Sequence, residues 1–299
     1  MEETITTAAR VRWRSTEGAT GAVLARLAPV LFVLAVATML TVPAVMSDMG
    51  FVFLAWDSHA YWEALRSPEP YAGAAVGVIG SFLYPPPFLQ ILAPLGQLPW
   101  PLFMFGWTAA LTATAVAMIR RVPRQYRAAW PFLYILAGTD IYAGNINLFI
   151  AYGVVLGLTI PVAWAGIALT KVTPGLGALW LAFRGRWADF GIALLATAVI
   201  AVLSFSADTA LWGDWLSVVF NENPVGGYAF TIPVPLFVRL PIAIVVLWWA
   251  ARSDRPWLVP AACILALPVI WLNGLSMLIG SAAIWGERQR RASAEAASR

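Results

Sequence analysis

Long apolar runs constrain the fold of this chain more than any other feature of its sequence. From about Leu27 to residue 286, runs of roughly 20 residues follow one another, separated by short polar or arginine-bearing segments. A helix of that length crosses the hydrocarbon core of a bilayer. Hydrophobic residues make up 61% of the chain and charged residues 11%, whereas soluble domains carry about 25% charged residues. The sequence therefore predicts an all-α, polytopic integral membrane protein with about nine to ten transmembrane or partly spanning helices.

The charges divide into two groups along the chain. Arginines gather in the stretches 10–26, 120–127, 184–186, 252–255 and 288–299. Acidic residues dominate the stretches 47–81 and 207–228, where Arg66 is the only base. The positive-inside rule places the arginine stretches in the cytoplasm and the acidic stretches outside.

This division predicts the domain organisation. A cytoplasmic segment 1–26 precedes a single transmembrane domain, 27–286, and a polar cytoplasmic tail, 287–299, which we expect to be disordered. Outer loops 47–81 and 207–231 interrupt the domain, and the aromatic residues of the first suit interfacial helices. We expect a multi-pass protein of the plasma membrane with both termini in the cytoplasm.

Two topologies compete in the middle of the chain. About ten clean spans would put the loop 120–127 outside, against the charge rule. Alternatively, 82–119 crosses once, and 161–183 enters and returns with Lys171 near its tip. We favour the second topology, because irregular backbone at membrane depth is tolerated where it lines a polar cavity.

Several functions find no support in the sequence. Nucleotide-binding and hydrolase motifs are absent, and the scattered arginines form no patch for nucleic acid. Cys263 is the only cysteine, and a single histidine with scattered carboxylates has no metal-ligand spacing. We therefore expect no metal, no cofactor and no nucleic-acid partner.

The polar cluster at 56–62 holds the first candidate site. Asp57 is a candidate catalytic base, although an acid in an outer loop is more often only solvated. His59, the only histidine, is either a substrate ligand or a structural hydrogen-bond donor. Tyr61 shares the helical face of Asp57, and Arg66 continues the polar side.

A second candidate site lies within the apolar runs. Lys171 is the only lysine and stands beside a helix break; it either reaches toward a headgroup or binds a phosphate. Asn145 and Asn147 sit at a helix junction and contact either a neighbouring helix or substrate. Asp140 and Arg239 also fall in apolar runs and pair with a neighbour or with each other.

With these residues in order, the chain resembles glycosyltransferase family 87, in the C superfamily of polytopic glycosyltransferases. The resemblance covers about residues 25–190 and rests on the order and spacing of Asp57 and Tyr61, Tyr84-Pro85-Pro86, Gly144-Asn145-Ile146-Asn147, Gly166-Ile167-Ala168-Leu169, Lys171-Val172-Thr173-Pro174 and Arg186-Trp187. The chain departs from the family at Asn145, where a glutamine is usual, and near Trp271-Leu272-Asn273, where a histidine closely follows the tryptophan.

The resemblance implies transfer of a sugar, commonly mannose, from a polyprenyl-phosphate donor to a glycan or glycolipid acceptor on the extracytoplasmic side. It implies Asp57 as the base of an inverting reaction, with Lys171 and Arg66 at the leaving phosphate. The further candidates for substrate contact are His59, Tyr61, Tyr84, Asn145, Asn147 and Asn273. Two alternatives remain open: a transporter or flippase for a lipid-linked sugar, and a catalytically inactive family member that lacks the C-terminal histidine.

Overall fold

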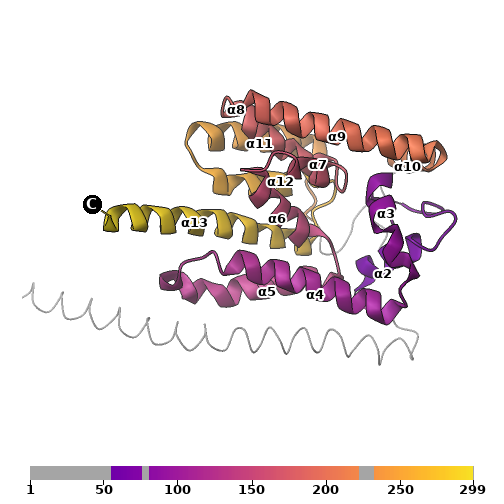
Figure 1. The fold of residues 1–299 in the computed structure, drawn as a ribbon, viewed down its shortest axis with the longest axis horizontal. Helices are drawn as coiled ribbons and strands as arrows, with labels where there is room; N and C mark the ends of the chain where they lie inside the picture. Colours follow the sequence, from indigo (N-terminus) through magenta and orange to yellow (C-terminus); the bar gives the residue numbers. More distant parts are fainter. Residues whose placement is uncertain (1–54, 76–80, 222–231, 299) are drawn as a thin grey trace, which may run out of the picture.

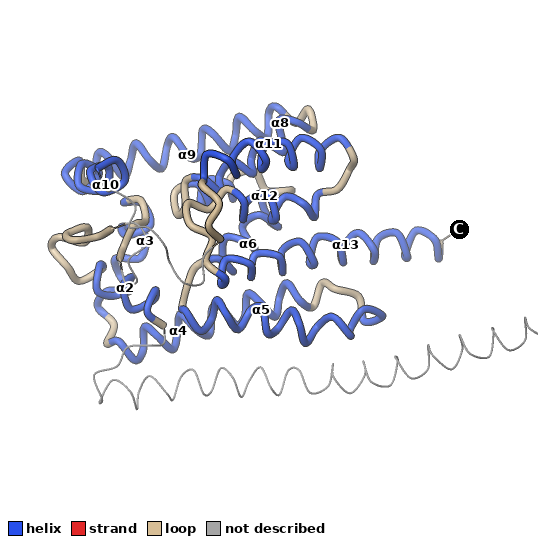
Figure 2. The backbone as a smooth tube through the Cα atoms, turned by 180° about the vertical axis from the view of Figure 1, so that it is seen from behind, coloured by secondary structure: helices blue, strands red, loops and turns tan. Residues whose placement is uncertain are grey.

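The structure is a computed structural model that describes residues 55–75, 81–221 and 232–298. Every regular element in these ranges is a helix (Figure 2), in agreement with the predicted all-α class. Outside the described residues lie the predicted cytoplasmic segment 1–26, the start of the predicted transmembrane domain (27–46) and parts of both outer loops.

Prolines set where the second and third described helices begin. Helix α2 (Trp56–Ala64) precedes α3 (Pro86–Leu92), which starts at the Tyr84-Pro85-Pro86 segment. Proline is tolerated in a first helical turn, where its missing N–H has no partner to lose. The short 3₁₀ helix η1 (Ala93–Gln97) then leads to Pro99. After this proline, α4 (Trp100–Ile119) runs without a break for 20 residues.

Three helical hairpins follow, and each breaks at its tip. The turn η2 (Arg124–Ala129) leads into α5 (Trp130–Ala143), which reverses at Gly144 into α6 (Asn147–Gly157). The second hairpin runs through α7 (Ala163–Ala168), η3 (Thr173–Ala178) and α8 (Leu179–Phe183). The third runs through η4 (Pro256–Leu258), α12 (Val259–Leu265), η5 (Leu272–Met277) and α13 (Leu278–Ala297). None of these helices runs through the whole molecule, so the tips of the hairpins lie in its interior (Figure 1).

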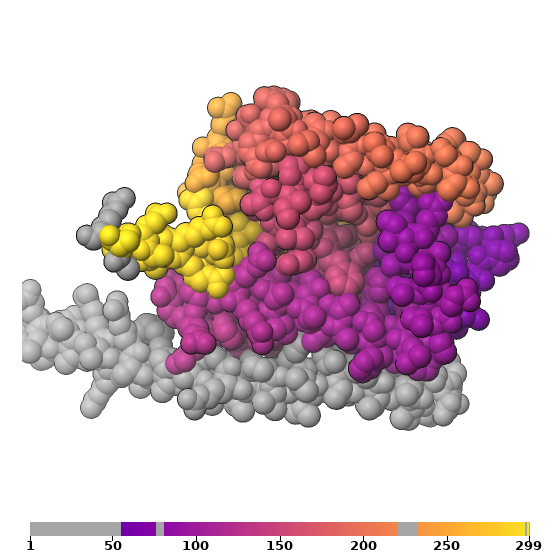
Figure 3. Space-filling model, in the orientation of Figure 1, coloured from indigo at the N-terminus to yellow at the C-terminus, as the bar shows by residue number. Residues whose placement is uncertain are grey.

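Helices α9 (Trp187–Ala207), α10 (Thr209–Asn221) and α11 (Leu236–Arg252) complete the described fold. α11 packs on α8 and α12. α9 and α10 extend along one side to cover α3 (Figure 3), where Trp215 Nε1 donates to the Leu83 carbonyl over 3.2 Å. Segments far apart in the sequence therefore close the molecule around the hairpin tips.

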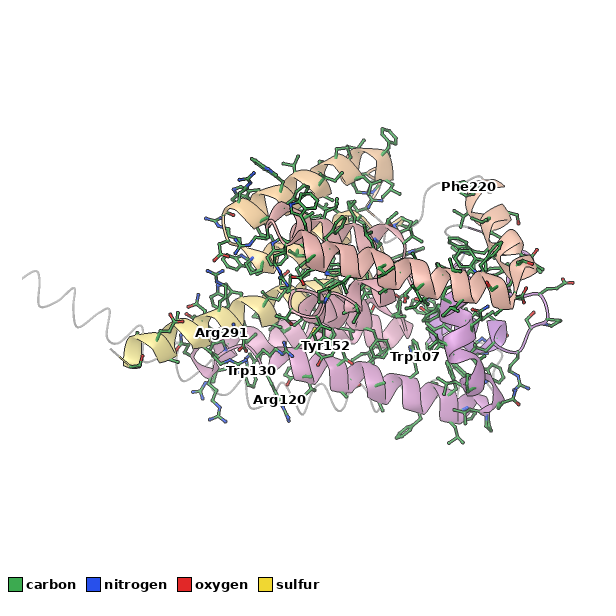
Figure 4. All side chains as sticks on the ribbon, turned by 45° about the horizontal axis from the view of Figure 1, so that its top comes forward. Trp107, Arg120, Trp130, Tyr152, Phe220 and Arg291 are labelled. Carbon is green, nitrogen blue, oxygen red and sulfur yellow. The ribbon has the colours of Figure 1, made fainter. Side chains whose placement is uncertain are left out.

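The arginine-bearing connections meet at one end of the molecule. Arg186 donates to the Leu158 carbonyl over 2.6 Å, so the two ends of the segment 161–183 lie together. Arg288 pairs with Asp254 over 2.6 Å, which closes the third hairpin in the same way. Arg120 and Arg291 lie toward this end and Trp107 further along α4 (Figure 4).

This arrangement agrees with the second of the two predicted topologies. α4 is one continuous helix, so 82–119 passes once between the ends of the molecule. The segment 161–183 enters and returns, with Lys171 at the break between α7 and η3. The loop 120–127 then shares the end that holds the other described arginine stretches, as the second topology predicts (Figure 1).

Two helices in the described ranges are long and apolar enough to cross a membrane, α4 and α9. In α9 only 11% of the apolar window is buried inside the protein. The core helix of a soluble protein would bury its apolar surface, whereas α9 leaves a continuous apolar face exposed. This exposed face is suited to contact with lipid.

One local expectation was wrong. The tail 287–299 was expected to be disordered, but α13 continues to Ala297, and Glu287 pairs with Arg290 and Arg291 at helical spacing over 2.7 and 3.4 Å. These pairs support a helix whose first half is already fixed by packing. Within the predicted outer loop 207–231, residues 209–221 form α10, and the Asp208 side chain caps its first turn at the Leu211 N–H.

Candidate functional site

The turn between α5 and α6 forms the base on which α2 sits. Gly144 ends α5 with a φ of 69°, a left-handed conformation that glycine adopts without strain. A Cβ at this position would collide with the Ser58 hydroxyl, so α2 approaches the turn closely. The Ala55 N–H donates to the Tyr142 carbonyl over 2.9 Å, and Trp107 Nε1 to the Gly144 carbonyl over 2.9 Å.

A chain of polar side chains links Asp57 to the interior. Asn145 Nδ2 donates to Asp57 Oδ2 over 2.6 Å, while Asn145 Oδ1 accepts from Lys171 Nζ over 3.2 Å. Lys171 Nζ also donates to Asn147 Oδ1 over 2.8 Å, and Asn147 Nδ2 donates to Asp140 Oδ1 over 2.9 Å. The five residues come from α2, from the α5–α6 hairpin and from the break after α7. We call this set, Asp57, Asn145, Lys171, Asn147 and Asp140, the polar chain.

Asp57 has the properties of a general base. Burial raises its pKa from 3.8 to about 6, and the Asn145 hydrogen bond and the Lys171 charge limit the rise. A base is most effective when its pKa lies near the working pH. Asp57 is half-buried, and its Oδ1 has no hydrogen-bond partner in the described part of the chain, so this oxygen is available to a proton donor.

Lys171 is held by two amide oxygens and one aromatic ring. An ammonium carries three N–H donors, and two of them go to Asn145 and Asn147. The Tyr84 ring centroid lies 5.7 Å from Nζ, within the range of a cation–π contact. The third N–H finds no acceptor among the residues that the structure describes, which leaves a donor for an anionic ligand.

Tyr61 and Tyr84 support the polar chain from one side. Their hydroxyls are 2.7 Å apart, and Tyr61 is 1% exposed. Burial raises the pKa of the Tyr61 phenol well above the usual value, so it remains protonated and does not compete with Asp57 as a base. Tyr71 donates to the Tyr84 carbonyl over 2.7 Å and fixes the segment before α3.

His59 lies on another face of α2, and Arg66 follows the end of that helix. The His59 ring meets Trp100 edge-on with the centroids 4.7 Å apart, and its Nδ1 is 3.5 Å from Glu63. Arg66 donates to the Gly96 carbonyl over 3.0 Å and stacks on Trp62 at 4.8 Å. Neither residue makes a hydrogen bond to the polar chain in the structure.

Asn273 belongs to the tip of the third hairpin. It is half-buried in η5, which packs against α5 and α6. The structure thus brings the Asn273 segment to the hairpin that carries Asn145 and Asn147, although no hydrogen bond of its side chain is seen.

The sequence left the partners of Asp140 and Arg239 open, and the structure assigns them. Asp140 is fully buried and pairs with Asn147. Arg239 instead donates to the carbonyls of Val234, Leu265, Leu267 and Pro268 over 2.6 to 2.8 Å, which satisfies the end of α12 at its tip. The two residues therefore do not pair with each other. An acid within an apolar run was the signal that could have placed Asp140 in the site.

These features define a class of protein before any comparison. The described residues form helices alone, and two long apolar helices among them, one exposed along its length, indicate a membrane protein. Its interior holds carboxylates and an ammonium joined by amides. In the part of the chain that the structure covers, no three His, Cys, Asp or Glu residues gather as metal ligands.

The family model of glycosyltransferase family 87 matches residues 82–294, well over half of the chain. The chain therefore belongs to glycosyltransferase family 87, as its sequence resemblance predicted. No curated protein and no solved structure matches it. The matched range contains Asn145, Asn147, Asp140 and Lys171 and begins after α2, so Asp57 joins the matched residues through the three-dimensional structure.

Proposed function

We propose that this glycosyltransferase transfers a sugar, mannose by family resemblance, from a polyprenyl-phosphate donor to a glycan or glycolipid acceptor, with inversion. One observation carries the proposal: Asn145 joins Asp57 to Lys171, although the two residues are far apart in the sequence. A proton acceptor and a cation thereby lie on either side of a single amide. Transfer from a sugar phosphate requires this pair, with the base at the acceptor and the cation at the phosphate.

The proposed reaction is a single displacement. The acceptor hydroxyl gives its proton to Asp57 Oδ1 as its oxygen forms a bond to the anomeric carbon. The bond from that carbon to the phosphate oxygen breaks, and its electron pair leaves with polyprenyl phosphate. Negative charge grows on this phosphate, and the third N–H of Lys171 stabilises it.

One carboxylate is sufficient for this chemistry. A phosphate is a good leaving group without protonation, unlike the sugar oxygen that leaves in glycoside hydrolysis and requires a second carboxyl group. The raised pKa of Tyr61 keeps its phenol neutral beside the polar chain. Asn145, Asn147, Tyr84 and Asn273 are proposed to line the donor side. His59 and Arg66, which face away from Lys171, are proposed to contact more distant parts of the substrates.

The proposed orientation follows from the distribution of charge. The arginine end lies in the cytoplasm by the positive-inside rule, which places α2 and Asp57 at the extracytoplasmic side of the plasma membrane. α13 ends at the arginine end, in keeping with a cytoplasmic C-terminus (Figure 1). A donor whose prenyl tail stays in the bilayer would present its sugar at the level of α2.

A transporter for a lipid-linked sugar is the second candidate. The three hairpins with broken tips favour it, since transporters bind substrates at interrupted helices near charged groups. An inactive family member is the third, because Asn273 stands where the family has a histidine. A carboxylate with a free oxygen beside the ammonium favours the transferase, which uses the two groups as base and phosphate ligand.

A single incubation separates the three candidates. The purified chain in lipid vesicles receives polyprenyl-phosphate mannose and a membrane glycolipid extract as the source of acceptor. We expect release of polyprenyl phosphate together with mannose on a glycolipid. Movement of the donor across the vesicle without cleavage would indicate a transporter, and neither result would indicate an inactive protein. Asp214→Asn, which neutralises an exposed carboxylate on α10, is the matched control for Asp57→Asn.

A further inference from the structure

Asp140 is a buried carboxylate that the proposed reaction does not use directly. It is fully buried within α5, and both of its oxygens accept hydrogen bonds. Oδ1 accepts from Asn147 Nδ2 over 2.9 Å and Oδ2 from the Leu148 N–H over 3.0 Å. Its backbone carbonyl also accepts from the Asn145 N–H over 3.1 Å. Asp140 thus contacts both asparagines of the turn that carries the site.

The hydrogen-bond chemistry of a carboxylate determines which way Asn147 faces. An ionised carboxylate only accepts, whereas an amide has one accepting oxygen and one donating nitrogen. The Asn147 nitrogen must therefore face Asp140, and its oxygen is left facing Lys171 Nζ at 2.8 Å. Asp57 fixes Asn145 by the same rule, and the Asn145 oxygen again faces Lys171.

The ammonium therefore stands between two amides, each of which is oriented by a carboxylate. Reversing either amide would turn an N–H₂ group toward an N–H₃⁺ group and replace an attraction with a repulsion. Two of the three N–H donors of Lys171 have their directions set in this way. The direction of the third follows from the tetrahedral geometry of the ammonium.

We propose that Asp140 is a positioning residue that acts through Asn147 to aim the free N–H of Lys171 at the leaving phosphate. This inference rests on the proposed function and deepens it, because it assigns the residue that sets the geometry of the cation. Asp140 itself touches neither substrate. Its loss should weaken stabilisation of the phosphate and leave the acceptor side, which belongs to Asp57, unchanged.

Asp140→Asn has a defined defect. The new amide presents one accepting oxygen to two donors, the Leu148 N–H and the Asn147 nitrogen, and its own nitrogen faces one of them. Asn147 then turns, and Lys171 loses an acceptor. We expect kcat to fall about tenfold to hundredfold, as for an unsatisfied buried polar group, with KM for the acceptor unchanged.

The exchange Asp140→Asn with Asn147→Asp restores every donor and acceptor. Asn at 140 accepts from the Leu148 N–H and donates to Asp at 147, whose other oxygen accepts from Lys171. Asn147→Asp alone sets two carboxylates against each other and should be the more damaging of these two single changes. We expect the exchanged pair to recover at least tenfold in kcat over either single variant, a recovery that a purely structural role of Asp140 does not predict.

A double-mutant cycle with Lys171→Met tests the route through the lysine. We expect Asp140→Asn to have less than a twofold effect on kcat once Lys171 is absent, because the residue acts through the ammonium. Ser204→Ala is the control, since Ser204 is a buried acceptor for Trp212 away from the site, and its effect should be the same with and without Lys171.

The outcomes are distinguishable from failure of the proposed function. Wild-type protein that releases no polyprenyl phosphate from polyprenyl-phosphate mannose overturns the transferase itself. The positioning role alone is overturned if the wild type is active and one of three results is found. These results are a fully active Asp140→Asn variant, an additive double-mutant cycle, or an exchanged pair that neither folds nor transfers. Thermal unfolding of each purified variant shows which of them fold.

Discussion

Replacing Asp57 with asparagine should abolish transfer and leave the protein at least as stable as the wild type. The two side chains have the same shape, and the asparagine oxygen can still accept the hydrogen bond from Asn145 Nδ2. The substitution therefore removes a negative charge and a proton acceptor and little else. Loss of a general base lowers kcat by about 10² to 10⁴-fold.

The effect on stability follows from the pKa of Asp57. Burial raises this pKa from 3.8 to about 6 in the folded protein, so the folded state binds the proton more tightly than the unfolded state. Stability therefore falls as the pH rises from about 4 to about 6, and the penalty is complete above that range. A shift of about two units at 1.36 kcal/mol each corresponds to about 3 kcal/mol. Partial exposure to solvent makes this an upper limit.

Two measurements check this prediction. Thermal unfolding between pH 4 and 8 should show the wild type losing stability across the titration of Asp57, with Asp57→Asn stabler by up to about 3 kcal/mol at pH 8. Wild-type kcat should rise with pH through about 6, because the base must lose its proton. A fully active Asp57→Asn variant, or one that unfolds well below the wild type at pH 8, would refute the reasoning.

Three further changes test the turn, the third hairpin and the topology. Gly144→Ala places a Cβ against Ser58 at a φ of 69° and should cost about 1 to 3 kcal/mol of stability together with most of the activity. Gly106→Ala, on an open face of α4, is the control and should be neutral or slightly stabilising. Equal behaviour of the two variants would count against the close packing of α2. Arg239→Met leaves the carbonyls at the tip of α12 without their donor and should lower stability by about 2 to 4 kcal/mol, measured by thermal unfolding. Arg252 is exposed, so the control Arg252→Met should change stability by less than about 0.5 kcal/mol. The prediction fails if both variants unfold alike. A cysteine at Arg124 should resist an impermeant thiol reagent added from outside, whereas one at Ser67 should react; labelling of Arg124→Cys from outside would contradict the proposed orientation.

Much of the helical arrangement could be predicted from the sequence because it follows from local rules. The prolines at 85–87 fix where α3 begins, and Pro99 fixes where α4 begins. Gly144 fixes where α5 ends. The positive-inside rule requires the loop 120–127 to share an end with the other arginines, and the described loops do so. The helical tail could not be read from composition, because packing of the first half of α13 and the Glu287 pairs stabilise it.

The sequence by itself determined the class of fold, the family and the residues that could carry charge in an apolar setting. Only the tertiary structure decided which of them meet. Asp57, Asn145 and Lys171 come together because two hairpins break at the same depth and α2 sits on the turn at Gly144. His59 and Arg66 lie nearer to Asp57 in the sequence, yet they face other partners. The physical reason is that a hydrogen bond between a carboxylate and an amide requires a short distance and a suitable direction. For side chains far apart in the sequence, only the packing of the helices provides that distance and direction.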